Sequence, residues 1–325
     1  MDEPIVVIVT EPEFRKAEQV FGRASGVHCV AAPVDEPQLA AAIRRAQAHA
    51  VIVGVQPYRD ALYAALPRGG VIARFGVGHD GIDKAQATSA GILCTNTPGV
   101  LEHSVAELTM LLVLAAARHL PEMTARTRGG EWGARVGSEV RGKSLAVIGR
   151  GRIGNAVMQL ASAFGMQVVC AGRNDDFGIA ASDADFVSLH LPANPDTHHF
   201  LNRDTLAVLS PHAWIINTAR GSVVDETALY DALTGGRLAG AALDVFEQEP
   251  YRPADPARDL RALPNVILTP HIGSNTVDAN AKMAARALKN VRFAMAREYV
   301  AMDLLNQDVR AMLEGGDGGS GGPLR

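Results

Sequence analysis

Short runs of apolar residues alternate with alanine-rich segments along most of the chain, and this pattern restricts the possible folds more than any other feature. In the segments between the runs, such as 38–48, apolar residues recur at helical spacing. Strands that are apolar throughout are buried on both faces, as in a parallel sheet covered by helices. The pattern therefore predicts an α/β protein with parallel sheets. In the first hundred residues the expected strands are 5–9, 27–31, 50–53, 71–75 and 92–95.

A second block with the same alternation begins at Ser144. A chain of 325 residues is long enough for about two domains, which agrees with two blocks. Residues 101–120 contain neither Gly nor Pro, so we expect one long helix that stops before Pro121. Another alanine-rich helix is expected at 278–299. The expected strands of the second block are 144–149, 167–172, 184–192, 213–219, 239–245 and 265–270.

The charge balance and the cysteines argue against several classes of protein. Lys and Arg number 31 and Asp and Glu 35, a net charge of −4, so we expect neither a nucleic acid nor a membrane surface as a partner. The longest apolar stretch, 108–117, is too short to span a bilayer, and the acidic N-terminus does not resemble a signal peptide. Cys29, Cys94 and Cys170 are too widely spaced for a disulfide framework or a zinc site. We expect a cytoplasmic protein without a metal.

Three glycines lie between an expected strand and an expected helix and match the G-x-G-x-x-G pattern of dinucleotide-binding turns. Gly149 would let the strand turn tightly, Gly151 would let the backbone approach a pyrophosphate, and Gly154 would let the helix pack closely on the sheet. The free N–H groups at the start of the helix favour an anion. The alternative is a tight turn with a structural role alone.

The residues after the next expected strand bear on the choice between NAD and NADP. An NAD site usually has an acidic residue about 20 residues after the glycines, where it binds the ribose hydroxyls. This chain has Gly172, Arg173 and Asn174 there, and Arg173 can pair with a 2′-phosphate. Asp175 and Asp176 follow and can bind a ribose if the loop curls back. We therefore expect NADP, with NAD as the alternative.

Three polar residues, Arg220, Glu249 and His271, follow three apolar strands of the second block. Because the carboxyl ends of parallel strands meet at one edge, we expect all three near the glycine turn. Reduction of a 2-oxo acid needs a cation for the carboxylate and a proton donor for the ketone oxygen, and Arg220 and His271 can supply these. Glu249, if hydrogen-bonded to the imidazole, would orient it and favour its protonated form. Taken singly, each residue is more simply interpreted as a surface charge, but the joint arrangement indicates a reductase.

The chain resembles the D-isomer-specific 2-hydroxyacid dehydrogenase family in seven segments between Gly76 and Ser274. The first seventy or so residues match only in their strand–helix pattern, and the glycine-rich tail does not match. At 171–173, Ala-Gly-Arg is most similar to NADP-preferring glyoxylate and hydroxypyruvate reductases of the family. Residues 173–185 are fewer than the family usually has here, which predicts a more open adenine pocket. The seven segments are GVGHDGID (76–83), TNTPGVLEHSVAEL (95–108), GRGRIG (149–154), SLHLPANPDTHHF (188–200), NTARGSVVDETAL (217–229), AALDVFEQEP (241–250) and TPHIGS (269–274).

This resemblance implies a fold, a reaction and an assembly. The fold would be two doubly wound parallel-sheet domains, with a Rossmann-type cofactor domain inserted into a flavodoxin-like substrate domain. Residues 1–100 and 291–314 would form the substrate domain and 101–290 the dinucleotide-binding domain. Independently of the resemblance, residues 315–325 are expected to be a disordered Gly-rich tail, because this composition cannot bury apolar surface. The enzyme would reversibly reduce a small 2-oxo acid to the D-2-hydroxy acid with NADP or NAD, as a homodimer.

The resemblance also implies roles for individual residues. Arg220, Glu249 and His271 would be catalytic, and the backbone N–H groups of Val77 and Gly78 would bind the substrate carboxylate together with Arg220. Asp244 would hold the carboxamide of the nicotinamide. The expected cofactor contacts are Thr109, Gly149, Gly151, Arg152, Ile153, Gly154, Arg173, Asn174, Leu191, Pro192, Thr197, Thr218, Ala219, Asp244 and Gly273.

Two other functions remain open from the sequence. A transcriptional corepressor resembling the C-terminal binding proteins would have the same architecture and the same three polar residues. A dehydrogenase of formate or phosphite would also bind its anion through an arginine, and would differ in the size of its cavity.

Overall fold

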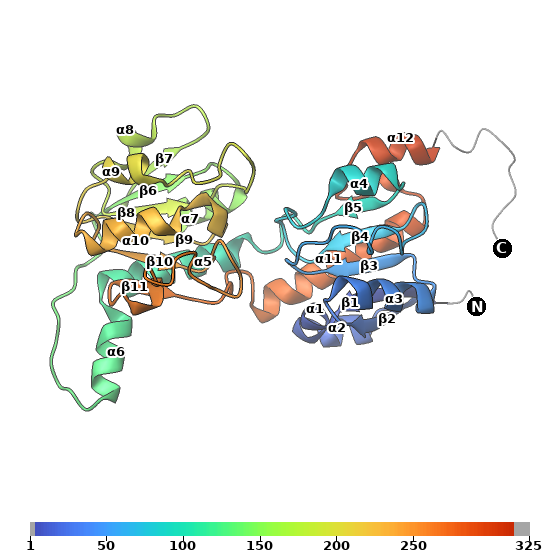
Figure 1. Cartoon of the computed structure of the whole chain (residues 1–325), viewed down its shortest axis with the longest axis horizontal. Helices are drawn as coiled ribbons and strands as arrows, with labels where there is room; N and C mark the ends of the chain where they lie inside the picture. The colour runs from blue at the N-terminus through green and yellow to red at the C-terminus, as the bar shows by residue number, and fades with distance from the viewer. Residues whose placement is uncertain (1–3, 315–325) are drawn as a thin grey trace, which may run out of the picture. The chain divides into compact units, whose positions relative to one another are not determined.

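The computed structural model describes residues 4–314, which form two compact units (Figure 1). Unit 1 comprises the described residues up to Leu101 and those from Asn275 onward, and unit 2 comprises Glu102–Ser274. The chain returns to unit 1 at 275, whereas the sequence placed this point at 291, because the whole of α11 (Val277–Met295) belongs to unit 1. The glycine-rich tail, 315–325, lies outside the described residues. Which ligand each unit binds stays a prediction.

Unit 1 is a five-stranded parallel sheet with helices packed against it. The strand order is β2-β1-β3-β4-β5, and the central strands β3 and β4 are wholly buried. This is the order of flavodoxin-like sheets, as expected. The strands are β1 (Ile5–Thr10), β2 (Val27–Ala32), β3 (Ala50–Val53), β4 (Val71–Arg74) and β5 (Leu93–Thr95). The helices are α1 (Glu11–Lys16), α2 (Glu18–Gly22), α3 (Glu36–Ala46), α4 (Lys84–Ser89), α11, the 3₁₀ turn η3 (Tyr299–Ala301) and α12 (Asp308–Glu314).

Unit 2 contains a six-stranded parallel sheet in the order β11-β10-β9-β8-β6-β7. The apolar runs of the sequence form these strands, each shortened by one or more residues at one or both ends. The strands are β6 (Ser144–Ile148), β7 (Gln167–Ala171), β8 (Phe186–Leu189), β9 (Trp214–Asn217), β10 (Gly240–Leu243) and β11 (Val266–Leu268). The helices are α5 (Glu102–Ala117), α6 (Leu120–Arg128), α7 (Arg152–Ala163), α8 (Phe177–Ala181), α9 (Arg203–Ala207), η1 (Gly221–Val223), α10 (Glu226–Thr234) and η2 (Leu260–Ala262).

The strand order of unit 2 reverses between β6 and β8, because β6 pairs with both β7 and β8. Ligands of open parallel sheets bind at such a reversal, beyond the carboxyl ends of the strands. Six-stranded dinucleotide-binding sheets commonly have the order 3-2-1-4-5-6. Here β7 is the edge strand, and residues 172–185 contain the short helix α8 and no strand. The segment that is short in the sequence therefore lacks a strand beyond β7.

The expected helix 101–120 ends earlier, and Pro121 does not stop it. α5 ends at Ala117, His119 adopts a left-handed conformation with φ of 50°, and α6 starts at Leu120 with the proline in its first turn. Proline is tolerated there because the first-turn N–H groups have no partner within the helix. In the described part of the chain, no single helix has the length and apolarity to cross a membrane. α5 and α6 reach that length only as a pair bent by 64°.

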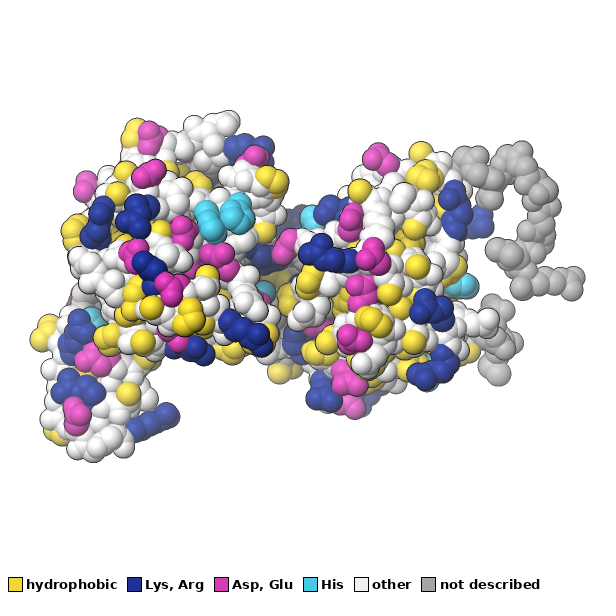
Figure 2. Space-filling model, in the orientation of Figure 1, with side chains coloured by type: hydrophobic (Ala, Val, Ile, Leu, Met, Phe, Trp, Pro, Cys, Tyr) yellow, Lys and Arg dark blue, Asp and Glu magenta, His cyan; other side chains and the backbone are white. Residues whose placement is uncertain are grey.

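The described surface mixes charges of both signs. On the face shown in Figure 2, Lys and Arg side chains lie among Asp and Glu side chains over each unit. The described cysteines are all free, and Cys94 is buried while Cys29 and Cys170 are half-buried.

Candidate active site

The glycine turn has the shape that the sequence predicts. Gly149 has φ of 116°, and a side chain there would collide with the backbone of His190 at the end of β8. A side chain at Gly154 would collide with the carbonyl oxygen of Gly149, so both positions require glycine. Gly151 is the N-cap of α7, and the space beside it is open. The open backbone and the N-terminus of a twelve-residue helix fit the pyrophosphate of a dinucleotide.

The loop after β7 holds one aspartate and leaves one arginine exposed. The Oδ2 atom of Asp175 accepts a hydrogen bond from the N–H of Gly172 (2.8 Å) and lies 2.9 Å from an Nη atom of Arg150. Asp176 caps α8 instead, and Asn174 is exposed. The exposed Arg173 side chain has no partner among the described residues. The sequence did not single out Arg150, whose role depends on a contact with the loop after the neighbouring strand.

Register brings the polar residues after β9, β10 and β11 to one edge of the sheet. Asn217 pairs with Leu243, and Leu243 pairs with Leu268, so the three strands end in one row. A side chain at Gly221 would collide with the backbone of Phe246, so glycine lets the segment after Arg220 approach the segment before Glu249.

Glu249 and His271 form a hydrogen-bonded pair at this edge. The Oε2 atom of Glu249 lies 2.7 Å from Nδ1 of His271, and both side chains are about a quarter exposed, at 28% and 27%. The other carboxylate oxygen, Oε1, accepts a hydrogen bond from the N–H of Phe246 (3.1 Å). Glu249 is therefore fixed by the backbone, and Nε2 is the ring nitrogen of His271 that remains for a substrate.

Asp244 holds the turn that carries His271. Its carboxylate is fully buried and accepts hydrogen bonds from the hydroxyl of Thr269 (2.6 Å) and from the N–H groups of Ile272 and Gly273 (2.8 Å each). Burial raises the pKa of Asp244, against the lowering effect of these donors. His271 has φ of 53°, an uncommon conformation for a residue with a side chain, and its N–H bonds the Asp244 carbonyl at 2.7 Å. The contact of Asp244 with the nicotinamide stays a prediction.

Arg220 follows β9 and is placed by Asn217, a residue that the sequence did not indicate. The buried Asn217 amide donates to the carbonyl of Arg220 (2.9 Å) and accepts from the N–H of Ala219 (3.0 Å). The half-buried guanidinium of Arg220 also donates to the Ala219 carbonyl (2.6 Å). These bonds close a tight turn that presents the guanidinium at the edge of the sheet.

Thr109 and Thr218 connect α5 with the end of β9. Their hydroxyl oxygens lie 2.9 Å apart, and the Thr109 hydroxyl donates to the carbonyl of Val105 (2.8 Å). Both residues are buried. The pair ties the long helix to the strand end that carries Arg220.

The remaining predicted contacts lie on loops of the two units. In unit 2, Leu191, Pro192 and Thr197 follow β8, and the Thr197 hydroxyl donates to the Pro192 carbonyl (2.5 Å), so it also stabilises its own loop. Arg152 and Ile153 begin α7, and Gly273 follows His271.

Val77 and Gly78 lie in unit 1, in the loop between β4 and α4. The Val77 carbonyl accepts a bond from the Asn96 amide (2.8 Å). Among the described residues, none bonds the N–H groups of Val77 and Gly78. No group of three or more possible metal ligands occurs in the described part of the chain.

Comparisons with known proteins identify the family. Residues 110–273 match the model of the D-isomer specific 2-hydroxyacid dehydrogenase, NAD binding domain. A glyoxylate reductase of Thermococcus litoralis is 40% identical over 265 residues, covering 75% of this chain and 78% of that protein. A D-3-phosphoglycerate dehydrogenase of Methanocaldococcus jannaschii is 39% identical over 324 residues, and the match covers 94% of this chain but 61% of that protein.

A solved structure gives the same result for the fold. It is an NADPH-dependent glyoxylate/hydroxypyruvate reductase from Sinorhizobium meliloti in complex with NADP and malonate. The two chains have a TM-score of 0.77 and are 30% identical, with 91% of this chain and 94% of the other covered. The chain therefore belongs to the D-isomer-specific 2-hydroxyacid dehydrogenase family, whose members are NAD(P)-dependent oxidoreductases.

Proposed function

We propose that this protein reduces a small 2-oxo acid of the glyoxylate or hydroxypyruvate kind to the D-2-hydroxy acid, with NADP as the preferred cofactor. The observation that carries the proposal is the Glu249–His271 hydrogen bond, at 2.7 Å, on a sheet edge that also carries the glycine turn. A carboxylate-oriented imidazole at this position suits proton donation to a carbonyl oxygen.

In the proposed mechanism, each residue of the edge has one task. The nicotinamide, when bound, supplies a hydride to the carbonyl carbon of the substrate. His271 donates the Nε2 proton to the carbonyl oxygen, and Glu249 keeps the ring oriented through Nδ1. Arg220 binds the carboxylate of the substrate and polarises its ketone. Val77 and Gly78 stay predicted contacts of the same carboxylate.

The names of the relatives support this class of substrate. Besides the glyoxylate reductase above, a hydroxypyruvate reductase of Thermotoga maritima is 40% identical over 234 residues. The D-3-phosphoglycerate dehydrogenase named above has a similar sequence identity of 39%, but this chain spans 61% of its length. We therefore keep 3-phosphoglycerate as a substrate to be tested beside the small acids.

The preference for NADP rests on Arg173, in the loop after β7, and on Arg150, in the glycine turn after β6. Arg173 is exposed, and Arg150 lies 2.9 Å from Asp175 of the loop after β7. A 2′-phosphate offers both guanidinium groups a bidentate partner. Asp175 opposes this choice, because its charge repels a phosphate and its carboxylate can accept bonds from ribose hydroxyls. Because the two arginines favour NADP and Asp175 favours NAD, NAD is the alternative cofactor.

A nucleotide titration followed by substrate addition tests the proposal. Purified protein is titrated with NADPH and with NADH. Glyoxylate, hydroxypyruvate, pyruvate, phenylpyruvate and 3-phosphohydroxypyruvate, the 2-oxo acid that corresponds to 3-phosphoglycerate, are then added while nicotinamide absorbance is followed. We expect tighter binding of NADPH and its oxidation by glyoxylate or hydroxypyruvate. Tight binding without oxidation by any acid would favour a nucleotide-sensing scaffold, or a formate or phosphite dehydrogenase.

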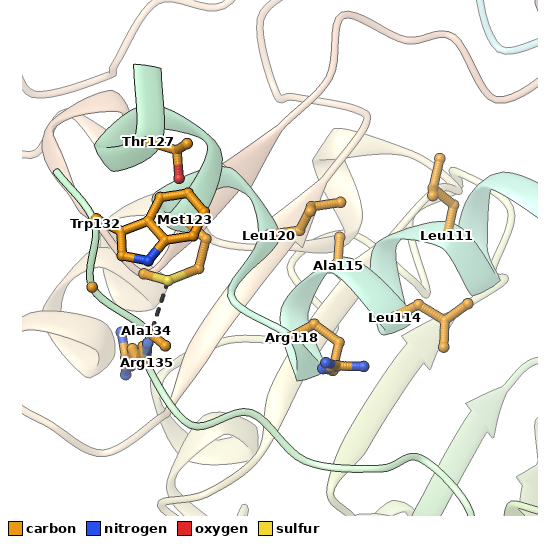
Figure 3. A pocket seen from close by; sticks show the side chains of 11 residues that line it. Leu111, Leu114, Ala115, Arg118, Leu120, Met123, Thr127, Trp132, Ala134 and Arg135 are labelled. Atoms are coloured by element: carbon orange, nitrogen blue, oxygen red, sulfur yellow. Dashed lines mark hydrogen bonds between the residues drawn. The ribbon is translucent and has the colours of Figure 1, made fainter. Parts of the chain in front are cut away.

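We further propose that α6 and the loop after it bind a second copy of the chain. They extend away from the rest of unit 2 (Figure 1), and α6 buries none of its residues. Leu111 and Leu114 of α5, Leu120 and Met123 of α6, and Trp132 of the loop line a groove of about 770 Å³ (Figure 3). Trp132 is 96% exposed. An exposed tryptophan beside a groove of apolar side chains is typical of a protein interface.

A further inference from the structure

A second buried carboxyl, Glu226, lies beside the Glu249–His271 pair and has no task in the mechanism above. Glu226 is the first residue of α10 and is 7% exposed. Its Oε1 atom accepts a hydrogen bond from the N–H of Glu247 (2.8 Å). Glu249 accepts a hydrogen bond from the N–H of Phe246, which is the residue before Glu247. Because Phe246 and Glu247 are consecutive residues, the two carboxyls lie within electrostatic reach of each other, and the charge of Glu249 acts on Glu226.

Other ionisable groups face Glu226 from the elements around it. The Glu247 carboxylate accepts a hydrogen bond from the N–H of Glu226 (3.2 Å). The same carboxylate lies 3.2 Å from Nε2 of His199. The phenol of Tyr251, in the same loop as Glu249, also lies within electrostatic reach of Glu226. The row therefore runs from His199 through Glu247, Glu226 and Glu249 to His271.

We propose that Glu226 is a positioning residue that sets the charge beside the Glu249–His271 pair. It carries a proton in weakly acidic solution and releases it in weakly alkaline solution, and its negative charge then favours the protonated imidazole that reduction consumes. The inference rests on the proposed reductase function. It adds to that function a reason why the reaction would persist toward alkaline pH.

The surroundings of Glu226 place its ionisation in the required range. Burial raises the pKa of Glu226 to about 7, and the charges of Glu247 and Glu249 act in the same direction. The N–H of Glu247 and the charge of His199 lower it again. Below this pH the protonated carboxyl adds no charge to the site. Above it, the row carries one more negative charge next to Glu249.

The variant Glu226→Gln tests the inference by its pH profile. The amide keeps an oxygen for the N–H of Glu247 but cannot ionise. Turnover is measured from pH 5.5 to 9.5 in both directions. Below about pH 6 we expect the variant to equal the wild type, because both are uncharged at this position. At alkaline pH the reduction rate of the wild type falls and its oxidation rate rises. In the variant we expect both changes at a pH that is lower by roughly one unit.

Glu11→Gln is the matched control, because it also removes one carboxylate, from an exposed pair with Arg15 in unit 1. It is expected to leave both profiles unchanged. A profile of Glu226→Gln identical to that of the wild type, or a loss of equal size at every pH, would overturn the inference. If Glu226→Gln does not fold, the wild-type profile decides. If Glu226 and His271 ionise as a coupled pair, the wild-type reduction rate falls with rising pH over a wider range than one ionisation gives. A fall that fits a single ionisation overturns the inference. An inactive wild type would overturn the proposed function as well.

Discussion

Asp244 shows how a single residue fixes the backbone of the candidate site. Its two carboxylate oxygens accept three hydrogen bonds from the turn that carries His271, and the His271 N–H bonds its carbonyl. A histidine in the left-handed region costs about 1–3 kcal/mol and persists only where its surroundings determine it. The hydrogen bonds to Asp244 hold His271 in this conformation, so Asp244 sets the position of the imidazole.

Replacing Asp244 with asparagine is therefore expected to lower turnover although no catalytic group is removed. The amide NH₂ would face one of three donors, which leaves a buried donor unsatisfied at a cost of about 1–3 kcal/mol. A displacement of the imidazole by about 1 Å can lower the rate roughly 100-fold. Steady-state turnover and thermal melting measure the two effects. Asp196→Asn, at an exposed position on a loop of the same unit, is the control. Turnover equal to that of the control would show that Asp244 does not position His271.

At the scale of the elements, Asp185 fixes two strands of unit 2 at their starts. Just before β8, it accepts bonds from the N–H and hydroxyl of Ser144 (2.8 and 3.0 Å) and from Lys143 (2.8 Å) at the start of β6. Burial would raise the pKa of Asp185, but the hydrogen bonds from Lys143 and Ser144 outweigh it, so the pKa lies below its usual value. A lowered pKa in the folded state contributes stability that is present above the unfolded pKa, near 3.9. That stability is lost as the pH falls through the lower, folded value.

The variant Asp185→Asn tests this link between the strands. At pH 7 we expect it to be less stable than the wild type by about 1–3 kcal/mol, because it leaves an ammonium or a backbone donor without its charged acceptor. The difference should shrink as the pH falls below about 4, where the carboxylate becomes protonated first in the unfolded chain and, at lower pH, in the folded protein. Urea unfolding at pH 7 and at pH 3 measures both values. A difference that stays constant between these two pH values would contradict the assigned ionisation.

The elements follow from the sequence where local pattern determines them. Continuous apolar runs predicted the strands of both sheets, and the expected α/β fold with two parallel sheets is confirmed. The prediction of one continuous helix over 101–120 was wrong, because the break between α5 and α6 depends on the backbone of His119, which no side-chain pattern signals. The bonds of Asp244 and Glu226 join residues more than 20 positions apart, so only the folded chain brings them together. The pairing of Arg150 with Asp175 was missed for the same reason.

At the scale of the whole molecule, the exposed groove around α6 predicts a homodimer. Size-exclusion chromatography with light scattering should give twice the 34.3 kDa of the chain. Trp132→Asp is expected to give a monomer, because it puts a charge into the apolar interface. The matched control is Ile179→Asp, at a residue of α8 that is 85% exposed. A wild-type mass of one chain, or a dimer that survives Trp132→Asp as well as it survives the control, would contradict the proposed interface.

The most direct test of the central claim compares His271→Ala with the wild type, by nucleotide binding and by turnover with the 2-oxo acid that the substrate screen finds. Removal of a general acid lowers turnover by roughly 10²–10⁴-fold, while the glycine turn and nucleotide binding stay intact. His212→Ala, with a side chain 58% exposed before β9, is the control and should change neither quantity. We predict unchanged binding of NADPH with turnover reduced within that range. Turnover of His271→Ala equal to that of the wild type would contradict the assignment of the Glu249–His271 pair as the proton donor.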